Sequence, residues 1–285
     1  MKEASKNTSQ ALIATRAEEG LPLQDFLAAR LSLSRRRAKA LVDSKNVWVN
    51  RQRVWMAHHT LKPGDHIQVP LAKEQAPQTP KLRVLAEDEF YLFADKPAGI
   101  VSVGENGAED ALRQQFQNPA LQAVHRLDRD TSGCLLVAKT PAAHAAAVAI
   151  FKTRRVLKLY VAIVAGRVQR SVSTINEELE GLRAVTHVSV LRAGQDATYL
   201  RLRIETGRTH QIRRHLVATR HPILGDREYG PKQVFDPRMR EVPRQMLHAV
   251  EIEMPHPMAG QGATELRAHS PLPADFRRCL KAFEL

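Results

Sequence analysis

The chain of 285 residues contains only two cysteines, Cys134 and Cys279. This number excludes a disulfide framework and a cysteine-rich zinc site. Aromatic residues make up only 5% of the chain, so aromatic stacking is not expected to be the main means of holding a nucleic-acid strand. Apolar runs such as 145–151 are far shorter than the roughly 20 residues that span a bilayer. The polar first 15 residues lack the apolar core of a signal peptide. We therefore expect a soluble, cytoplasmic protein with no membrane segment.

Acidic residues are scarce relative to basic ones. The chain has 30 Asp and Glu against 43 Lys and Arg, which gives a formal net charge of +13. Such an excess predicts a polyanionic partner, most often nucleic acid. The apolar share of 43% and the charged share of 26% are ordinary for a globular protein and exclude wholesale disorder. The length predicts one or two domains.

In the N-terminal part, the sequence predicts a loose polar tail over residues 1–15, followed by a small module over residues 16–70. Within the module, Leu23, Phe26 and Leu27 lie at helical spacing, and serines at 32 and 34 can cap a second helix. A hairpin around Asn50, a Pro-Gly-Asp turn and a closing strand follow. Two helices and a few strands over this length predict a self-contained αα-β domain.

The second predicted helix opens with four cations, Arg35, Arg36, Arg37 and Lys39. Mutual repulsion and the helix dipole both disfavour positive charge at this end. An anion would relieve both effects, and phosphate is the natural candidate. The alternative is a solvated charged face without a partner.

Residues 71–81 contain two prolines and no periodicity, which predicts a linker. The remainder, 82–285, is predicted to form a second domain in which strands outnumber helices. The strand-like segments are 90–94, 134–139, 160–165, 186–191, 199–204 and 248–254, and the helical ones are 109–116, 141–153 and 209–219. Because strands and helices do not alternate strictly, we predict an α+β fold with a mixed, largely antiparallel sheet.

Two polar segments of this second domain are candidates for chemistry. In the first, residues 125–133, two carboxylates, those of Asp128 and Asp130, lie among arginines that would keep a carboxylate ionised and able to act as a nucleophile. In the second, residues 207–215, Thr209 can cap a helix whose N-terminus would hold a carboxylate or a phosphate beside His210 and Arg213. The alternatives are a salt-bridged turn and a structural basic helix.

Together these segments resemble the signature motifs of the RluA-type pseudouridine synthase family. The resemblance rests on HRLDRDTSG at 125–133, GRTHQIRRHL at 207–216, HPILGD at 221–226, YG at 229–230, KPAG at 96–99 and KLYVA at 158–162. The N-terminal module resembles the S-four-type RNA-binding domain through residues 23–27, 33–38, 47–50 and 61–65. Both resemblances keep the order of the motifs along the chain.

The resemblance implies a role for each matching residue. Asp128 is the implied catalytic aspartate, Tyr160 lies against the target base, and Arg213 pairs with the aspartate. Arg126 is implied to replace the extruded base in the RNA stack. Among the remaining basic residues, Arg208, His210 and the helix of Arg35–Lys39 are expected to contact RNA. The family uses no metal or organic cofactor.

The expected function is therefore isomerisation of uridine to pseudouridine in RNA by a protein for which a monomer is favoured. Large-subunit ribosomal RNA is the favoured substrate and transfer RNA the alternative. Two other classes remain open, a non-catalytic RNA-binding or ribosome-assembly factor and a hydrolase of a glycosidic bond. We expect packing for Trp48 and Trp55, with base stacking as the alternative. Surface or RNA-facing places are expected for most of the histidines His58, His59, His210, His215 and His221.

Overall fold

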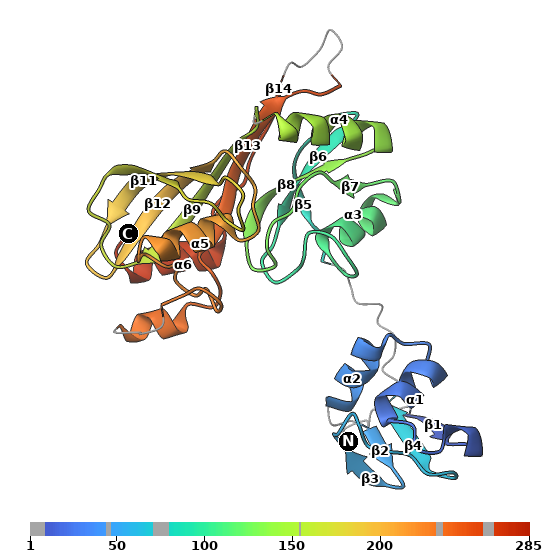
Figure 1. The fold of residues 1–285 in the computed structure, drawn as a ribbon. Coiled ribbons are helices and arrows are strands. Elements are labelled where there is room, and N and C mark those ends of the chain that lie inside the picture. The colour runs from blue at the N-terminus through green and yellow to red at the C-terminus, as the bar shows by residue number, and fades with distance from the viewer. Residues whose placement is uncertain (1–8, 44–46, 71–79, 154, 232–235, 259–264) are drawn as a thin grey trace, which may run out of the picture. The chain divides into compact units, whose positions relative to one another are not determined.

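The computed structural model describes residues 9–43, 47–70, 80–153, 155–231, 236–258 and 265–285. The chain divides into two compact units, Met1–Gln78 and Thr79–Leu285 (Figure 1). Each unit has its own buried core. No helix among the described residues is long and apolar enough to cross a membrane.

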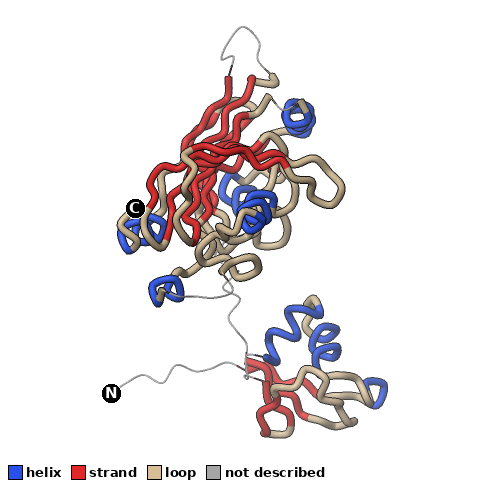
Figure 2. The backbone as a smooth tube through the Cα atoms, turned by 60° about the vertical axis from the view of Figure 1, so that its left-hand side comes forward, coloured by secondary structure: helices blue, strands red, loops and turns tan. Residues whose placement is uncertain are grey.

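The N-terminal unit is a four-stranded antiparallel sheet with two helices on one side (Figure 2). The strands, in their order across the sheet, are β1 (Ser9–Ile13), β4 (His66–Pro70), β2 (Val47–Val49) and β3 (Gln52–Val54), and the helices are α1 (Leu23–Arg30) and α2 (Arg35–Asp43), after a short 3₁₀ turn at Arg16–Glu18. Phe26 of α1, Val42 of α2 and Ile67 of β4 are all fully buried. The helical spacing and the hairpin expected from the sequence are confirmed.

The predicted loose tail is wrong for residues 9–13. These residues form β1, which pairs with β4 so that Leu12 lies opposite Ile67. Leu12 packs against the core of the unit and Ala14 is buried. These two apolar residues anchor a segment that looks polar in the sequence. Residues 1–8, and residues 71–79 of the predicted linker, lie outside the described part of the chain.

The C-terminal unit is built on a ten-stranded sheet in the order β10-β11-β12-β9-β13-β8-β6-β5, with β14 paired to β13 and β7 to β8. The strands are β5 (Arg83–Glu87), β6 (Tyr91–Lys96), β7 (Gln122–Ala123), β8 (Ser132–Ala138), β9 (Leu157–Ala165), β10 (Val172–Asn176), β11 (Val185–Ala193), β12 (Ala197–Ile204), β13 (Leu247–Pro255) and β14 (Glu265–His269). The helices are α3 (Ala108–Phe116), α4 (Pro141–Lys152), α5 (Gln211–Ala218) and α6 (Ala274–Ala282), with a 3₁₀ helix at Pro237–Glu241.

Among the described strand pairings of this sheet, β8 with β13 is parallel and the others are antiparallel. The predicted α+β class with a mixed, largely antiparallel sheet is therefore confirmed. In β6, Tyr91 and Phe93 face the cluster that contains α4, whereas Leu92 and Ala94 face the cluster that contains α3. Both faces are covered, which explains why this segment is a continuous apolar run instead of an alternating one.

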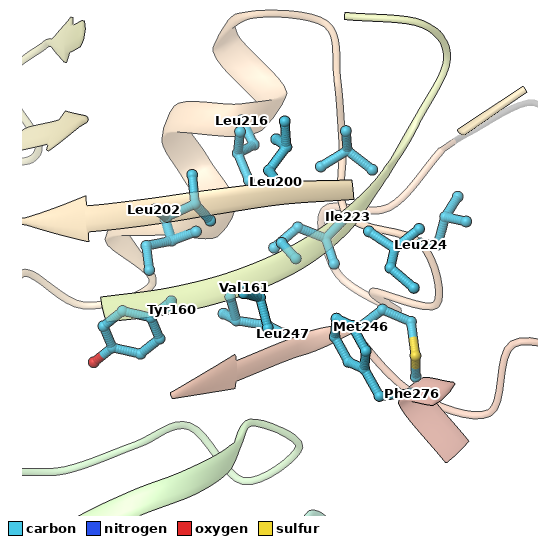
Figure 3. Packing of buried hydrophobic residues seen from close by; sticks show 14 of the residues in the cluster. Tyr160, Val161, Leu200, Leu202, Leu216, Ile223, Leu224, Met246, Leu247 and Phe276 are labelled. Carbon is cyan, nitrogen blue, oxygen red and sulfur yellow. The ribbon is translucent and has the colours of Figure 1, made fainter. Parts of the chain in front are cut away.

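The other half of the sheet carries α5 and α6. Leu216 of α5 packs with Leu200 and Leu202 of β12, and Phe276 of α6 lies near Met246 (Figure 3). Ile212, at the start of α5, belongs to the same buried cluster as Tyr160 of β9 and Ile204 of β12. Residues from the start of α5 can therefore meet residues from β9.

The parallel pair brings two backbones unusually close. Gly133 at the start of β8 lies opposite Ala249 of β13 and has φ +118°, a region that favours glycine. A Cβ atom at Gly133 would overlap the carbonyl oxygen of Ala249. The loop that precedes β8 is thereby held against the centre of the sheet.

A buried histidine lies beside this pair and sets a pH dependence. His248 of β13 is fully buried, with Nδ1 2.9 Å from Oγ of Ser132 and Nε2 3.2 Å from the carbonyl oxygen of Ser270. Burial lowers the pKa of His248 to about 4. The unfolded chain, with a histidine pKa of about 6.5, binds more protons between these values. Stability is therefore full above about pH 6.5 and is lost as the pH falls towards about 4.

We expect His248 alone to account for a fall on the order of 3 kcal/mol in the free energy of unfolding across this window. Urea unfolding at pH 7 and pH 4.5 measures it. A His248→Gln variant should lose less stability on acidification than the wild type. The partly exposed His144 of α4, in the same unit, provides the control, since His144→Gln should keep the wild-type profile. If acidification lowered the free energy of unfolding equally in the wild type and in His248→Gln, His248 would not be the cause of the pH dependence.

Candidate active site

One pocket of the C-terminal unit collects residues from several separate segments of the chain. Its lining includes Arg126, Asp128, Tyr160, Arg208, His210 and Arg213, together with apolar residues such as Ile204 of β12 and Leu247 of β13. The first six come from the loop before β8, from β9, and from α5 and the segment just before it. Six residues singled out in the sequence thus lie around a single hollow.

The guanidinium of Arg213 is the electrostatic centre of this pocket. Its Nη1 lies 3.2 Å from Oδ2 of Asp128, and its Nη2 lies 3.0 Å from Oε2 of Glu228. Its Nε and Nη2 bind both oxygens of Asp226, at 2.6 Å and 2.9 Å. Burial lowers the pKa of Arg213, but the hydrogen bonds and charges of Asp226 and Asp128 outweigh burial and raise the pKa above its usual value. Arg213 is a permanent cation that fixes the Asp128 carboxylate.

Asp226 holds the far side of that guanidinium. Its side chain is completely buried and also accepts hydrogen bonds from the backbone N–H groups of Glu228 and Tyr229, both at 3.0 Å. Burial raises the pKa of Asp226, but the bonds from Arg213 and from these N–H groups reverse the effect and lower it. The bidentate geometry sets the orientation of the guanidinium plane. Only Nη1 is left to face Asp128.

His210 lies on the open side of the carboxylates. Its Nε2 is 3.8 Å from Oδ1 of Asp128, and its Nδ1 is 3.5 Å from Oε2 of Glu228 and 3.3 Å from the hydroxyl of Tyr229. His210 has φ +53°, in the left-handed region that is uncommon for residues other than glycine. The turn thus holds the imidazole at the pocket in a conformation that carries strain.

The predicted N-cap of this helix is wrong by one position. The sequence favours Thr209, but α5 begins after His210 and no side-chain hydrogen bond caps it. Gln211 replaces the cap, since its side chain accepts from the N–H of Arg208 and the hydroxyl of Thr206. A buried glutamine that contacts the preceding turn is not visible as a local capping pattern.

His215 is also placed differently from the expectation. It is fully buried in α5, with Nδ1 2.9 Å from Oγ1 of Thr186 and Nε2 3.2 Å from the carbonyl oxygen of Glu177. Burial lowers its pKa. His215 therefore anchors α5 to β11 and does not reach the RNA-facing surface that the sequence predicts for most histidines.

Tyr160 forms the apolar wall of the pocket. Its ring lies at the edge of the packed cluster in Figure 3, opposite Leu202 in the neighbouring strand. Burial, and to a lesser degree the negative charge of Asp128, raises the pKa of its hydroxyl. The hydroxyl is accordingly held in its neutral form. A flat ring beside an ion-paired carboxylate suits a planar, polar ring as ligand.

The loop that carries Asp128, residues 125–131, is braced from below by buried polar side chains. Ser102 bonds both the N–H and the carbonyl of Leu127, Lys96 donates to the carbonyl of Arg129, Arg244 donates to the carbonyl of Asp130 and to Ser132, and Gln245 donates to Thr131. Burial lowers the pKa of Lys96 to about 7. Three carbonyl oxygens surround its Nζ at 2.8–3.1 Å, however, and this geometry favours the ammonium form.

Arg244 ties this loop to the last helix of the chain. It is 8% exposed and binds both oxygens of Asp275 in α6, at 2.7 Å and 3.1 Å. We expect Arg244→Met to lower the free energy of unfolding by about 3–5 kcal/mol, because Asp275 and several carbonyl oxygens lose their partner. Urea unfolding measures the change. The exposed Arg277 of the same helix is the matched control, and Arg277→Met should be nearly neutral. Equal values for the two variants would contradict the expectation.

The remaining predicted residues lie at the rim or in the other unit. Arg126 and Arg208 are exposed at the pocket edge. In the N-terminal unit, the N–H of Arg37 bonds to the Ser34 hydroxyl, which confirms that the second serine caps α2. Arg35 and Lys39 form ion pairs with Asp25 and Asp43, each at 2.7 Å. Their charges are thus partly compensated, and the Arg36 side chain lies outside the described part of the chain.

The sequence motifs assign no role to three residues of the site, Asp226, Glu228 and Arg244. The first two lie in or just after the HPILGD segment that was already part of the resemblance, so their place near that motif was an available signal. Arg244 stands in a segment without any motif. Only the fold brings it to Asp130 and Ser132.

Comparison with known proteins gives the family. A family model described as RNA pseudouridylate synthase matches residues 90–218, and a model described as S4 domain matches residues 21–67. The chain is 35% identical to a protein named ribosomal large subunit pseudouridine synthase D from Xanthomonas campestris pv. campestris, over 90% of this chain and 85% of that one. A Pseudomonas aeruginosa protein of the same name is also 35% identical, over 80% of this chain and 83% of that one.

A solved structure titled Human RNA Pseudouridylate Synthase Domain Containing 4 shares the fold, with a TM-score of 0.60 and 23% identity, over 70% of this chain and 92% of that chain. The predicted fold of the larger unit and the S-four-type identity of the N-terminal module are confirmed. The chain belongs to the RluA-type family of RNA pseudouridine synthases, enzymes that isomerise uridine in RNA, and it carries an N-terminal S4 domain.

Proposed function

We propose that this enzyme isomerises uridine in ribosomal RNA with Asp128 as its nucleophile. The observation that carries the proposal is the partly exposed Asp128 carboxylate, ion-paired to the buried Arg213 and open to the same pocket as Tyr160. An ionised carboxylate that is fixed in place and shielded on one side meets the requirements for nucleophilic attack.

The reaction breaks the bond between N1 of uracil and C1′ of the ribose and forms a bond between C5 and C1′. Asp128 bonds transiently either to the sugar carbon or to the ring, and both routes release the carboxylate again. The C5 proton leaves to a base and N1 gains a proton, so nothing is lost from the RNA. We assign the planar wall against the base to Tyr160, whose neutral hydroxyl can relay the C5 proton.

The target uridine must leave the RNA stack to reach the pocket. Unstacking and unpairing require on the order of a few kcal/mol. We propose that Arg126, exposed at the pocket rim and two residues before Asp128 in the same loop, fills the vacated place and recovers part of that free energy. Arg208 and His210 line the same pocket from the segment just before α5 and are proposed to contact the flanking phosphates.

The substrate class follows from the relatives and from the charge. Several relatives, in addition to the two compared above, are named as ribosomal large subunit pseudouridine synthases. A net charge of +13 suits a large folded RNA in the cytoplasm, where ribosomes are assembled. We therefore propose large-subunit ribosomal RNA as the substrate, with transfer RNA as the second candidate.

Chemical mapping of pseudouridine tests reaction and substrate together. Purified enzyme is incubated with unmodified ribosomal and transfer RNA, and each product is mapped and assayed for free uracil. We expect new pseudouridine at a small number of positions in large-subunit RNA and no free uracil. Modification of transfer RNA alone would overturn the substrate, free uracil would indicate a hydrolase, and binding without modification would indicate a non-catalytic factor.

A further inference from the structure

The sheet of the N-terminal unit has one face that the helices leave uncovered. Strand alternation places Val47, Val49 and Ile67 against α1 and α2. The neighbouring residues therefore point to the opposite side, which we call the outer sheet face. Its exposed residues are Ala11 and Ile13 of β1, His66 and Gln68 of β4, Trp48 of β2 and Arg53 of β3.

Large apolar side chains are exposed on this face and in the segment that directly follows β3. Trp48 is 36% exposed, Ile13 is 53% exposed, and Trp55 and Met56, which directly follow β3, are 59% and 61% exposed. Trp48 and Trp55 are the two tryptophans of the whole chain. The expectation that both tryptophans serve packing is therefore wrong for Trp55, which exposes more than half of its surface, whereas Trp48 is about two-thirds covered. Exposed large side chains gathered in this way mark a binding surface.

The charge of the face is positive. The guanidinium of Arg53 lies 4.8 Å above the Trp48 ring, and Arg51 is exposed in the adjoining turn. Neither arginine forms an ion pair with a described residue, whereas Arg35 and Lys39 on α2 both do. Among the described residues of the outer sheet face there is no Asp or Glu.

Indole rings beside uncompensated arginines provide the two interactions that hold an unpaired nucleotide, stacking on the base and attraction of the phosphate. A double helix would keep its base faces hidden from such a surface. We propose that the outer sheet face and the two segments next to it bind unpaired bases of the substrate RNA, through Trp48 on the face and Trp55 directly after β3, with Arg51 and Arg53 on the backbone. The inference rests on the proposed RNA substrate and adds a second contact to it, remote in sequence from the catalytic pocket.

Tryptophan fluorescence of the full-length protein tests the proposal selectively, because both indoles belong to this module. A single-stranded uridine-rich oligoribonucleotide is titrated in, and its affinity is measured in parallel by anisotropy of a labelled copy. We expect the RNA to quench the tryptophan fluorescence saturably, at the same midpoint concentration as the anisotropy curve. Trp48→Ala and Trp55→Ala should each weaken binding by about 5- to 100-fold. Trp48→Phe and Trp55→Phe, which keep an aromatic ring, should recover most of the loss.

Two controls show whether the binding belongs to this face and to unpaired bases. Val172→Ala removes a side chain that is 69% exposed in the other unit and should leave affinity unchanged. A duplex of the same sequence should quench the emission far less than the single strand. Circular dichroism verifies that each variant is folded.

Unchanged emission at saturating RNA, or wild-type affinity in both alanine variants, would overturn the inference. Emission that depends on protein concentration without RNA would also overturn it and would indicate self-association through this face. The experiment distinguishes this inference from the proposed function. If the enzyme forms pseudouridine but the tryptophan fluorescence does not change, only this inference is contradicted. If the RNA quenches the fluorescence but no pseudouridine forms, only the proposed function is contradicted.

Discussion

Replacing Asp128 by asparagine is expected to lower kcat on the order of 10⁴-fold or more while RNA affinity stays within a few-fold. The amide keeps the shape of the side chain and can still contact Nη1 of Arg213, but it lacks the charge that a nucleophile needs. Single-turnover conversion of uridine, measured with excess enzyme, isolates the chemical step. Filter binding of the same RNA gives the affinity.

Asp130 offers a matched control within the same loop. The same substitution, Asp130→Asn, removes a carboxylate two residues away that does not line the pocket. Its backbone carbonyl, which accepts from Arg244, is unaffected by the change. We expect single-turnover rates within a few-fold of the wild type. If Asp128→Asn retained turnover, or if both variants lost it equally, Asp128 would not be the nucleophile.

The second large loss of activity is expected on substitution of Asp226, a buried residue that is not proposed to touch the substrate. Asp226→Asn should lower kcat about 10²-fold with little change in KM, because the guanidinium of Arg213 loses the charged bidentate partner that aims it at Asp128. Leaving the buried cation without its main counter-charge should also reduce the free energy of unfolding by about 3–5 kcal/mol. Single-turnover rates across a range of RNA concentrations separate kcat from KM.

Glu228 is the natural comparison, since it binds the same guanidinium at 3.0 Å but is 54% exposed. A solvated ion pair contributes little, at most about 1 kcal/mol. Glu228→Gln should therefore leave stability almost unchanged and lower kcat only a few-fold. A loss in Glu228→Gln as large as that in Asp226→Asn would show that the total negative charge around Arg213, and not its orientation, is what matters.

Much of the site could be predicted from the sequence because its residues occupy contiguous motifs. Asp128 and Arg213 stand in dense polar segments whose spacing is distinctive even without a fold. What could not be predicted is the support of those residues. Arg244 and Lys96 reach the Asp128 loop from strands and turns far away in the chain. A local pattern contains no information about which distant cation will meet which carbonyl.

The fold, like the site, has parts that can be predicted from the sequence and parts that cannot. Strands with four or more apolar residues, such as 134–139 and 160–165, are visible as runs in the sequence. Short or polar elements are not. β10 at Val172–Asn176 and β14 at Glu265–His269 owe their conformation to pairing with β11 and β13. α6 begins without a side-chain cap and is held by Asp275 and Phe276, which contact residues from other segments.

The contact of Gly133 with the backbone of Ala249 has a consequence for how this enzyme could acquire new targets. Since no larger residue fits there, we expect substitutions at the start of β8 to be unable to shift the loop that carries Asp128, the proposed nucleophile. We therefore expect divergence in target choice to occur in the regions proposed to contact RNA, namely the arginines at the rim of the pocket and the outer sheet face of the N-terminal unit. In directed evolution towards a different RNA, we expect Gly133 and Ala249 to stay unchanged and the successful mutations to occur at those outer positions.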